Sequence, residues 1–254
     1  MKRSIKGNIA LRYWIVRKCA CCGEIFSREE WERVLCEPCE IRYRAAKLES
    51  CPSCFLSVHE CRCMPPLLSK SGVLCLRKLS FYRRDRHSEP QNQMIYRLKE
   101  KPNCRVAEFL TEELARGVRE ELATLGRDTN PETVCVVGVP RSRRSMMIYG
   151  YDQALLLAEC LARVLGVSYV RAIDRRYGGK EQKRMKGFQR VKNISGQFYL
   201  TKEADALRDR CVILVDDVVT TGASMAACAK LLRGVGAREI LGVVIGQNEN
   251  RRDT

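Results

Sequence analysis

Two adjacent carboxylates, followed by a turn rich in hydroxyl groups, are the residues of this sequence best suited to chemistry. Asp216 and Asp217 follow a short apolar run, 212–215, that reads as a buried strand. The stretch behind them contains Val218, Thr220, Thr221, Gly222, Ala223 and Ser224, and a helical pattern continues from Met225. Free N–H groups and the dipole at such a helix start suit a phosphate group, and hydroxyl groups add donors. The paired acids suit sugar hydroxyl groups or a magnesium ion.

A simpler interpretation of this stretch is an ordinary capped turn between a strand and a helix in an α/β protein. The two acids would then serve only as capping charges at the helix start. An Asp-Asp pair alone would favour that interpretation. The complete run from Asp216 to Ser224 favours binding of a phosphorylated sugar instead.

A second group of chemically capable residues is the cysteine-rich segment near the N-terminus, which holds nine of the 15 cysteines. Their spacing gives two sets of four, Cys19, Cys22, Cys36 and Cys39, then Cys51, Cys54, Cys61 and Cys63. Two paired knuckles joined by a short ribbon are typical of tetrahedral Zn²⁺, and four protein ligands leave no open position for water. We therefore predict one or two structural zinc sites and no zinc chemistry.

The ligand assignment within this segment has alternatives. Cys21 could replace Cys22, His59 is a further candidate for the second site, and the two sets could interleave. Disulfides or a redox-active Cys-x₂-Cys pair are disfavoured by the repeated pairing and by a reducing compartment.

The formal net charge of +16 points to anionic partners such as nucleic acid, phosphosugars or pyrophosphate. Without an apolar stretch of membrane-spanning length or a signal h-region, the chain is expected to be cytoplasmic.

The elements that must position these residues follow from the apolar patterns. Helices are expected over 91–99, 105–125 and 155–165, and strands over 134–139, 167–172, 212–215 and 240–245, whereas 67–90 shows only a weak pattern. This alternation predicts an α/β fold, a parallel sheet covered by helices on both faces. Ligands of such sheets bind at the carboxyl ends of the strands, where the acids and Arg141 would meet.

Three parts of the chain are expected: a basic N-terminal tail, 1–18, a cysteine zinc module, 19–64, and an α/β domain, 65–254. The tail is either an arm for nucleic acid or, more simply, a solvated terminus. Residues 171–192 carry nine basic and two acidic side chains, among them Lys183, Arg184 and Arg190. That stretch is either a lid over a polyanion or a solvated charged loop.

Taken in order, these motifs resemble the ComF family (competence protein F), within the type I phosphoribosyltransferase superfamily. The resemblance rests on Leu98-Lys99, Val139-Pro140, Gly150 to Ala154, Gln182…Arg190…Asn193 and the run Asp216 to Ser224. It implies a type I phosphoribosyltransferase-like fold that binds phosphoribosyl pyrophosphate (PRPP) with Mg²⁺.

The resemblance also implies roles for individual residues. Asp216 and Asp217 would hold the ribose hydroxyl groups and Mg²⁺ as the catalytic pair, and residues 220–224 would wrap the 5′-phosphate. Arg141, Lys183 and Arg184 would face pyrophosphate. The PRPP-binding set is completed by Val218, Gln153 and Arg190.

Two positions depart from the family pattern. Tyr149 stands where the family usually has arginine, and Asp152 where it usually has asparagine. An anion at position 152 is expected to weaken phosphate binding unless Mg²⁺ or an arginine compensates.

Two functions follow as hypotheses. The first is a phosphoribosyltransferase that acts on an unidentified acceptor. The second is a non-catalytic, PRPP-binding accessory factor of DNA uptake and recombination. The resemblance implies a link to natural transformation, with single-stranded DNA and a helicase-like protein as partners. A plain zinc-ribbon nucleic-acid binder is a weaker third hypothesis, because DNA binding needs no acid pair before Thr-Thr-Gly.

Overall fold

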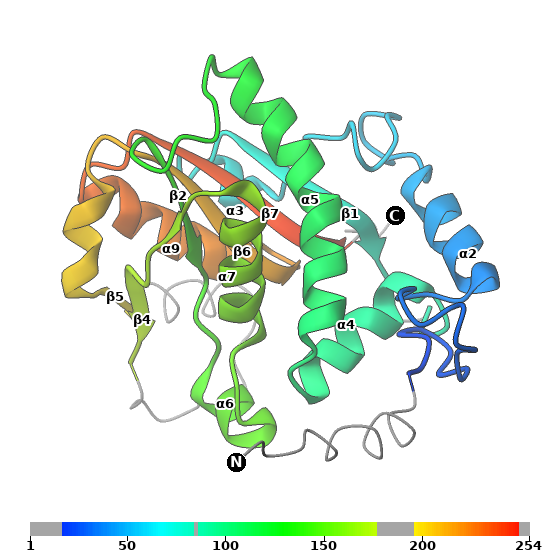
Figure 1. The fold of residues 1–254 in the computed structure, drawn as a ribbon. Coiled ribbons are helices and arrows are strands. Elements are labelled where there is room, and N and C mark those ends of the chain that lie inside the picture. The colour runs from blue at the N-terminus through cyan, green and yellow to red at the C-terminus, as the bar shows by residue number, and fades with distance from the viewer. Residues whose placement is uncertain (1–16, 84–85, 177–195, 249–254) are drawn as a thin grey trace, which may run out of the picture.

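A parallel β-sheet forms the centre of the molecule in a computed structural model, which describes residues 17–83, 86–176 and 196–248 (Figure 1). The sheet has five strands in the order β1-β7-β6-β2-β3, and all neighbouring pairs run parallel. Its strands are β1 (Cys75–Tyr82), β2 (Val134–Gly138), β3 (Ser168–Tyr169), β6 (Cys211–Val219) and β7 (Glu239–Asn248). A separate antiparallel pair is made of β4 (Ile173–Arg175) and β5 (Phe198–Leu200).

Helices cover both faces of this sheet, as the alternating pattern predicts. On one face α5 (Cys104–Thr124) and α7 (Gln153–Leu165) pack together, and on the other α9 (Ala223–Gly234) packs beside α3 (Pro66–Ser69). The remaining elements lie around the edges: α2 (Glu37–Lys47), α4 (Pro90–Glu100), α6 (Arg143–Tyr149) and a 3₁₀ helix (Lys202–Leu207). The α/β fold with a doubly covered parallel sheet is therefore confirmed.

The sequence of β6 shows why both faces are covered. Successive side chains of a strand point to opposite faces, so Ile213 and Val215 join the core beneath α5 and α7, whereas Val212 and Leu214 join the core beneath α9. All four are completely buried. A strand buried on both faces reads as a continuous apolar run, which is what 212–215 shows.

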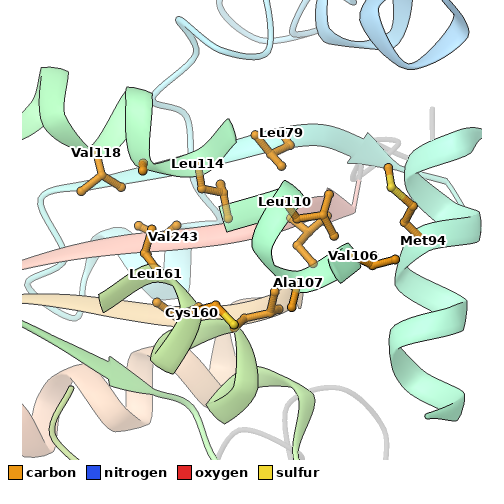
Figure 2. Packing of buried hydrophobic residues seen from close by; sticks show 14 of the residues in the cluster. Leu79, Met94, Val106, Ala107, Leu110, Leu114, Val118, Cys160, Leu161 and Val243 are labelled. Atoms are coloured by element: carbon orange, nitrogen blue, oxygen red, sulfur yellow. The ribbon is translucent and has the colours of Figure 1, made fainter. Parts of the chain in front are cut away.

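The amphipathic helix expected over 105–125 is α5, and its apolar stripe fills the larger core. Figure 2 shows Leu110, Leu114 and Val118 of α5 directed toward the sheet, with Leu161 of α7 and Val243 of β7 nearby. Asn103 caps the helix, because its side-chain oxygen accepts from the Val106 N–H at 3.1 Å. Packing against α5 thus holds α7 so that it begins next to the carboxyl end of β6.

Three strands differ from the sequence-based expectation. The stretch 67–90, whose pattern is weak, contains β1, and all eight β1 residues are buried. Arg77, Lys78 and Ser80 interrupt its apolar pattern, and their polar groups are satisfied inside the protein. The second difference is that β6 continues to Val219 in register with β7, so the acids lie within the strand and not behind it. Of the strand expected over 167–172, two residues form β3.

The cysteine-rich segment packs directly on the α/β domain. Cys19, Phe26 and Leu35 belong to the same buried cluster as the α5 residues, and the Tyr43 and Phe109 rings lie 5.4 Å apart. The boundary between 64 and 65 stays a prediction. Within the described residues, no helix is long and apolar enough to cross a lipid bilayer.

Gly138 provides a test of how closely α7 must approach the sheet. A Cβ atom at this position would lie 2.7 Å from Leu155 Cδ2 and 3.2 Å from the Ala154 carbonyl oxygen. We expect Gly138→Ala to lower the free energy of unfolding by about 1–3 kcal/mol, measured by urea denaturation, because backbone and core must shift.

Gly234→Ala is the matched control, since a Cβ atom at the last residue of α9 meets no atom within 4 Å. Its stability should stay equal or rise slightly. Equal losses in the two variants would contradict the argument from close packing.

Candidate functional site

The acid pair lies at the carboxyl end of β6, where the sheet predicts a ligand site. Strand alternation directs Asp217 toward α7 and Asp216 toward α9. The Asp216 carboxylate turns back to the backbone of its neighbour, since its Oδ1 accepts from the Asp217 N–H at 2.8 Å. Burial, reinforced by the charge of Asp217, raises the pKa of Asp216 well above its usual range. Such a pair favours a cation or a hydroxyl donor beside it.

Side chains from two other elements contact Asp217. The Gln153 side-chain amide, at the start of α7, donates to Asp217 Oδ2. Lys99 Nζ, at the end of α4, lies 3.4 Å from the same oxygen. Lys99 also lies over the Tyr82 ring of β1, 5.8 Å from its centroid. Asp217 is therefore held in one orientation by side chains from α7 and α4.

Gln153 leaves one polar atom without a partner at this site. Its side chain is almost completely buried, at 2% exposure, and its Oε1 accepts no hydrogen bond within the described residues. The hydroxyl group of Tyr151, two residues earlier, has no partner within that same part of the chain. Burying an unpaired acceptor is costly, so such atoms call for an explanation in a bound group. A ligand hydroxyl donating to Gln153 Oε1 beside Asp217 would satisfy it.

The stretch 220–224 forms a tight turn into α9. Gly222 has φ +76°, and a Cβ atom there would lie 3.1 Å from the Leu68 Cβ, so glycine is required for both reasons. No side chain caps the start of α9, unlike the starts of α5, α6 and α7, which Asn103, Ser142 and Asp152 cap. The first N–H groups of α9 are thus left for an anion or water.

Arg141 is held in place by contacts with residues just before α7. Its backbone N–H donates to Asp152 Oδ2 at 2.7 Å, and its Nη1 donates to the Tyr151 carbonyl at 3.2 Å. The guanidinium carbon lies 4.8 Å from the Tyr149 ring centroid and 5.9 Å from that of Tyr151. The Tyr149 ring, at a position where the ComF resemblance leads one to expect arginine, therefore positions Arg141.

Asp152 acts as a helix cap and not as a free anion in the site. Its Oδ1 accepts from the Ala154 and Leu155 N–H groups at 3.0 and 3.3 Å, while its Oδ2 accepts from Arg141. Burial raises the pKa of Asp152, and these three N–H groups act against that shift. The expected repulsion of phosphate is reduced, because three donors already face this carboxylate.

The structure brings together most, but not all, of the residues expected at the site. The carboxyl end of β6 carries Asp216 and Asp217 and leads into the turn 220–224, and Gln153 at the start of α7 bonds to Asp217. Arg141 is joined to the start of α7 by the hydrogen bond from its N–H to Asp152. Lys183, Arg184 and Arg190 lie outside the described residues. Lys99 was not among the expected ligands, although the Leu98-Lys99 motif was the signal that could have identified it.

Both cysteine sets are assembled as two four-thiol clusters. The sulfur atoms of Cys19, Cys22, Cys36 and Cys39 lie within 4.8 Å of one another, as do those of Cys51, Cys54, Cys61 and Cys63. The sets follow each other in chain order, and neither Cys21 nor His59 belongs to them. Both clusters could hold a metal ion.

The backbone favours a thiolate at one cysteine of each cluster, whereas burial raises the pKa of Cys36, Cys39, Cys61 and Cys63. The Cys21 and Cys36 N–H groups donate to Cys19 Sγ at 3.4 and 3.3 Å, and the Ser53 N–H donates to Cys51 Sγ at 3.4 Å. Burial would raise the pKa of Cys19 and of Cys51, yet the backbone N–H groups outweigh it and lower both pKa values to about 7. A thiolate is the form that ligates metal.

Comparison with known proteins agrees with this architecture. A family model described as the phosphoribosyl transferase domain matches residues 108–253, more than half of the chain. The chain belongs to the phosphoribosyl transferase domain family. The match begins within α5, so β1 and α4, which supply Tyr82 and Lys99, precede the matched part of this domain.

Curated relatives of this chain confirm its resemblance to ComF. Competence protein F of Haemophilus influenzae is 33% identical over 106 residues, 41% of this chain and 46% of that protein. DNA utilization protein YhgH of Salmonella typhi is 29% identical over 156 residues, 61% of this chain and 66% of that protein. The chain thus spans between about half and two thirds of the length of these relatives.

Solved structures with some likeness are also phosphoribosyltransferases. A hypoxanthine phosphoribosyltransferase from Staphylococcus aureus is 16% identical with a TM-score of 0.34, covering 58% of this chain and 68% of that one. A purine phosphoribosyltransferase from Pyrococcus horikoshii is 18% identical with the same TM-score, covering 56% and 84%. At this level no residue role is transferred from them.

The raised pKa of Asp216 leads to a pH-dependent prediction. Because the folded-state pKa exceeds the unfolded one, Asp216 costs the native state stability as pH rises above the usual range of aspartate, about 4. Asp216→Asn removes this cost and keeps an acceptor for the Asp217 N–H. We expect its free energy of unfolding, measured by urea denaturation, to exceed that of wild type by about 1–2 kcal/mol at pH 7.5, and this difference to shrink toward pH 4.5.

Asp205→Asn, at an exposed acid on the 3₁₀ helix, is the control and should leave stability unchanged at each pH. A stability difference between Asp216→Asn and wild type that is the same at all pH values would contradict the assignment.

Asp152→Asn tests the capping role of Asp152. An asparagine can cap α7 with its oxygen, but its NH₂ group would then face the Arg141 N–H, donor against donor. Removing a buried charge partly offsets this loss. We therefore expect a net loss of about 1 kcal/mol in the free energy of unfolding, measured by urea denaturation at pH 7.

Glu159→Gln, an exposed acid on the same helix, is the matched control for neutralising one charge on α7. If Asp152→Asn is as stable as this control, the Arg141 N–H does not depend on Asp152.

Proposed function

We propose that this protein binds PRPP with Mg²⁺ at the carboxyl end of β6 and transfers its phosphoribosyl group to an acceptor. The observation that carries the proposal is the buried Gln153, which donates to Asp217 while its own Oε1 has no donor within the described residues. A site built in this way needs a ligand with hydroxyl groups next to the acid pair. The match to the phosphoribosyl transferase domain supports a ribose phosphate as that ligand.

Each part of PRPP has a chemically suitable neighbour. The ribose hydroxyl groups would donate to Asp216, Asp217 and Gln153. The 5′-phosphate would accept from the open N–H groups at the start of α9 and from the hydroxyl groups of Thr220, Thr221 and Ser224. The pyrophosphate would face Arg141, whose guanidinium is already held by the Tyr149 and Tyr151 rings. Lys183, Arg184 and Arg190 complete the cationic side of this proposal.

The carboxylates fit a hard cation with oxygen ligands. Asp216 and Asp217 would bind Mg²⁺ directly or through water, and a bound cation would act against the burial that raises the pKa of Asp216. A bound Mg²⁺ neutralises charge on the pyrophosphate. Lys99 lies beside Asp217 and would keep its carboxylate oriented while the ligand binds.

The transfer itself depends on positioning and charge. The bond from ribose C1′ to pyrophosphate breaks, the acceptor attacks C1′, and the acceptor's proton passes to solvent, since no general base stands out among the described residues. The acids orient the ribose so that C1′ faces the acceptor, while Arg141 stabilises charge on the departing pyrophosphate.

We further propose that the two cysteine clusters each hold a structural Zn²⁺. Eight cysteines in two compact sets, with N–H groups directed at Cys19 and Cys51, support metal thiolates and not free thiols. With four ligands each, these ions would support folding and would not take part in the transfer.

A second candidate function is a PRPP-binding accessory factor that handles single-stranded DNA without turnover. It is favoured by the names of the relatives, competence protein F and DNA utilization protein, and by the formal net charge of +16. A helicase-like partner belongs to this candidate. Binding to the phosphate backbone of DNA would weaken steeply as salt rises.

Calorimetric titration with PRPP and Mg²⁺ tests the shared part of both candidates. We expect wild type to bind and Asp217→Asn to bind at least about tenfold more weakly, a loss of about 1.4 kcal/mol, because the carboxylate charge toward ribose and metal is removed. Asp205→Asn, at the exposed acid used above, should bind like wild type. No heat from folded wild type with Mg²⁺ present would contradict the proposal.

Release of pyrophosphate distinguishes the two candidates. A transferase releases pyrophosphate from PRPP when nucleobases or amines are supplied, and Asp217→Asn slows that release. Binding of PRPP without release from any acceptor, together with salt-sensitive binding of single-stranded DNA, would support the accessory role instead.

A further inference from the structure

Lys78, in the middle of β1, is a buried cation with an unusual set of partners. Its side chain is 3% exposed overall, and its Nζ donates to the Cys63 carbonyl at 2.8 Å, the Cys61 carbonyl at 3.2 Å and the Leu76 carbonyl at 3.4 Å. All three acceptors are neutral. Two of them belong to cysteines of the second cluster, defined by Cys51, Cys54, Cys61 and Cys63.

The neighbouring cations show that this is an exception. Lys78 borders a cavity of about 290 Å³ between α2, α5 and β1, and four other cations line it. Lys47 and Arg116 pair with Glu113, Arg77 pairs with Glu120 and Glu121, and Arg44 pairs with Glu40. Among the described cations of this cavity, Lys78 alone has no carboxylate in a recorded ion pair.

A buried ammonium group needs a compensating negative charge. Carbonyl dipoles satisfy its hydrogen bonds but carry no net charge. The second cysteine cluster, whose backbone Lys78 contacts, is able to supply that charge, since four thiolates and one divalent ion together carry a formal charge of −2. Lys78 is bonded to the backbone of two of those four cysteines, so the cation is fixed against the loop that bears this charge.

We propose that Lys78 is the counter-cation of a metal centre at Cys51, Cys54, Cys61 and Cys63, and that it ties the loading of that centre to the edge strand β1. The proposal rests on the metal centre proposed above. Lys78 is a positioning residue: it holds the Cys61 and Cys63 carbonyls, and hence the loop, in the geometry in which four sulfur atoms meet. The loaded centre in turn balances the charge that β1 buries.

The edge strand gives this coupling a route toward the acid pair. Beyond Lys78, β1 continues to Tyr82, whose ring lies under Lys99, and Lys99 pairs with Asp217. Loss of metal from the second centre is therefore expected to loosen β1 and to weaken PRPP binding through this chain of contacts.

Competition with a chelator on the full-length, metal-loaded protein tests the proposal. Two equivalents of metal are expected in wild type. For Lys78→Met, one equivalent should be lost at roughly 10–100-fold lower chelator concentration, the usual effect of removing a group that supports metal ligands, while the other is unchanged. Lys78→Arg keeps the charge and can donate to both carbonyls, so it should restore most of the affinity. Lys47→Met is the matched control in the same cavity and should release metal like wild type.

The metal dependence of stability separates this role from simple packing. Lys78→Met should lower the midpoint of thermal unfolding of the loaded protein, whereas in excess chelator the loss should vanish or reverse, because the wild type then buries an unpaired charge. A loss of the same size with and without metal would mean that Lys78 only fills space, and would overturn the proposal.

Two further results have distinct meanings. Wild type without any bound metal would refute the metal centres themselves, whereas two equivalents released identically by wild type and Lys78→Met would refute only the role of Lys78. If inorganic phosphate stabilises wild type but not Lys78→Met, and metal release is the same in both, the cation serves an anion in the cavity instead, which also overturns the proposal.

Discussion

The placement of two acids inside a buried strand is the constraint on which the rest of this structure depends. Asp216 and Asp217 stay in β6 while the strand remains paired with β7 as far as Val219. Carboxylates at such a position cost free energy unless donors and cations compensate them. Gln153 from α7 and Lys99 from α4 do so for Asp217, and the raised pKa of Asp216 reflects a cost that is not fully compensated. Native proteins keep such costs where a ligand will relieve them.

Buried charge also explains how the cysteine-rich segment is joined to the sheet. The edge strand β1 carries Arg77 and Lys78 into the interior, where Arg77 meets two carboxylates of α5 and Lys78 meets the carbonyls of the second cysteine cluster. The apolar contacts of Tyr43 with Phe109 act beside these polar ones. The sheet edge, α5 and the cysteine-rich segment are therefore joined by buried polar contacts as well as by apolar packing.

The two departures from the family pattern have local structural roles. Asp152 caps α7 and fixes the Arg141 backbone, and Tyr149 stacks on the Arg141 guanidinium. Judged by charge alone, an aspartate beside a pyrophosphate site is unfavourable. Its hydrogen bonds show that this carboxylate is directed at backbone N–H groups, so the geometry reverses the inference drawn from residue type.

The sequence by itself determined the doubly covered parallel sheet, the helices α5, α7 and α9, the position of the acid pair near the carboxyl end of β6 and the two sets of four cysteines, because apolar periodicity and ligand spacing are local properties. Only the tertiary structure decided where β1 lies, because Arg77 and Lys78 interrupt its apolar pattern. Their polar groups are satisfied by partners from other parts of the chain. The same holds for Lys99, whose ion pair with Asp217 joins residues from α4 and β6. Charge compensation between distant elements depends on how they pack, and no spacing rule along the chain encodes it.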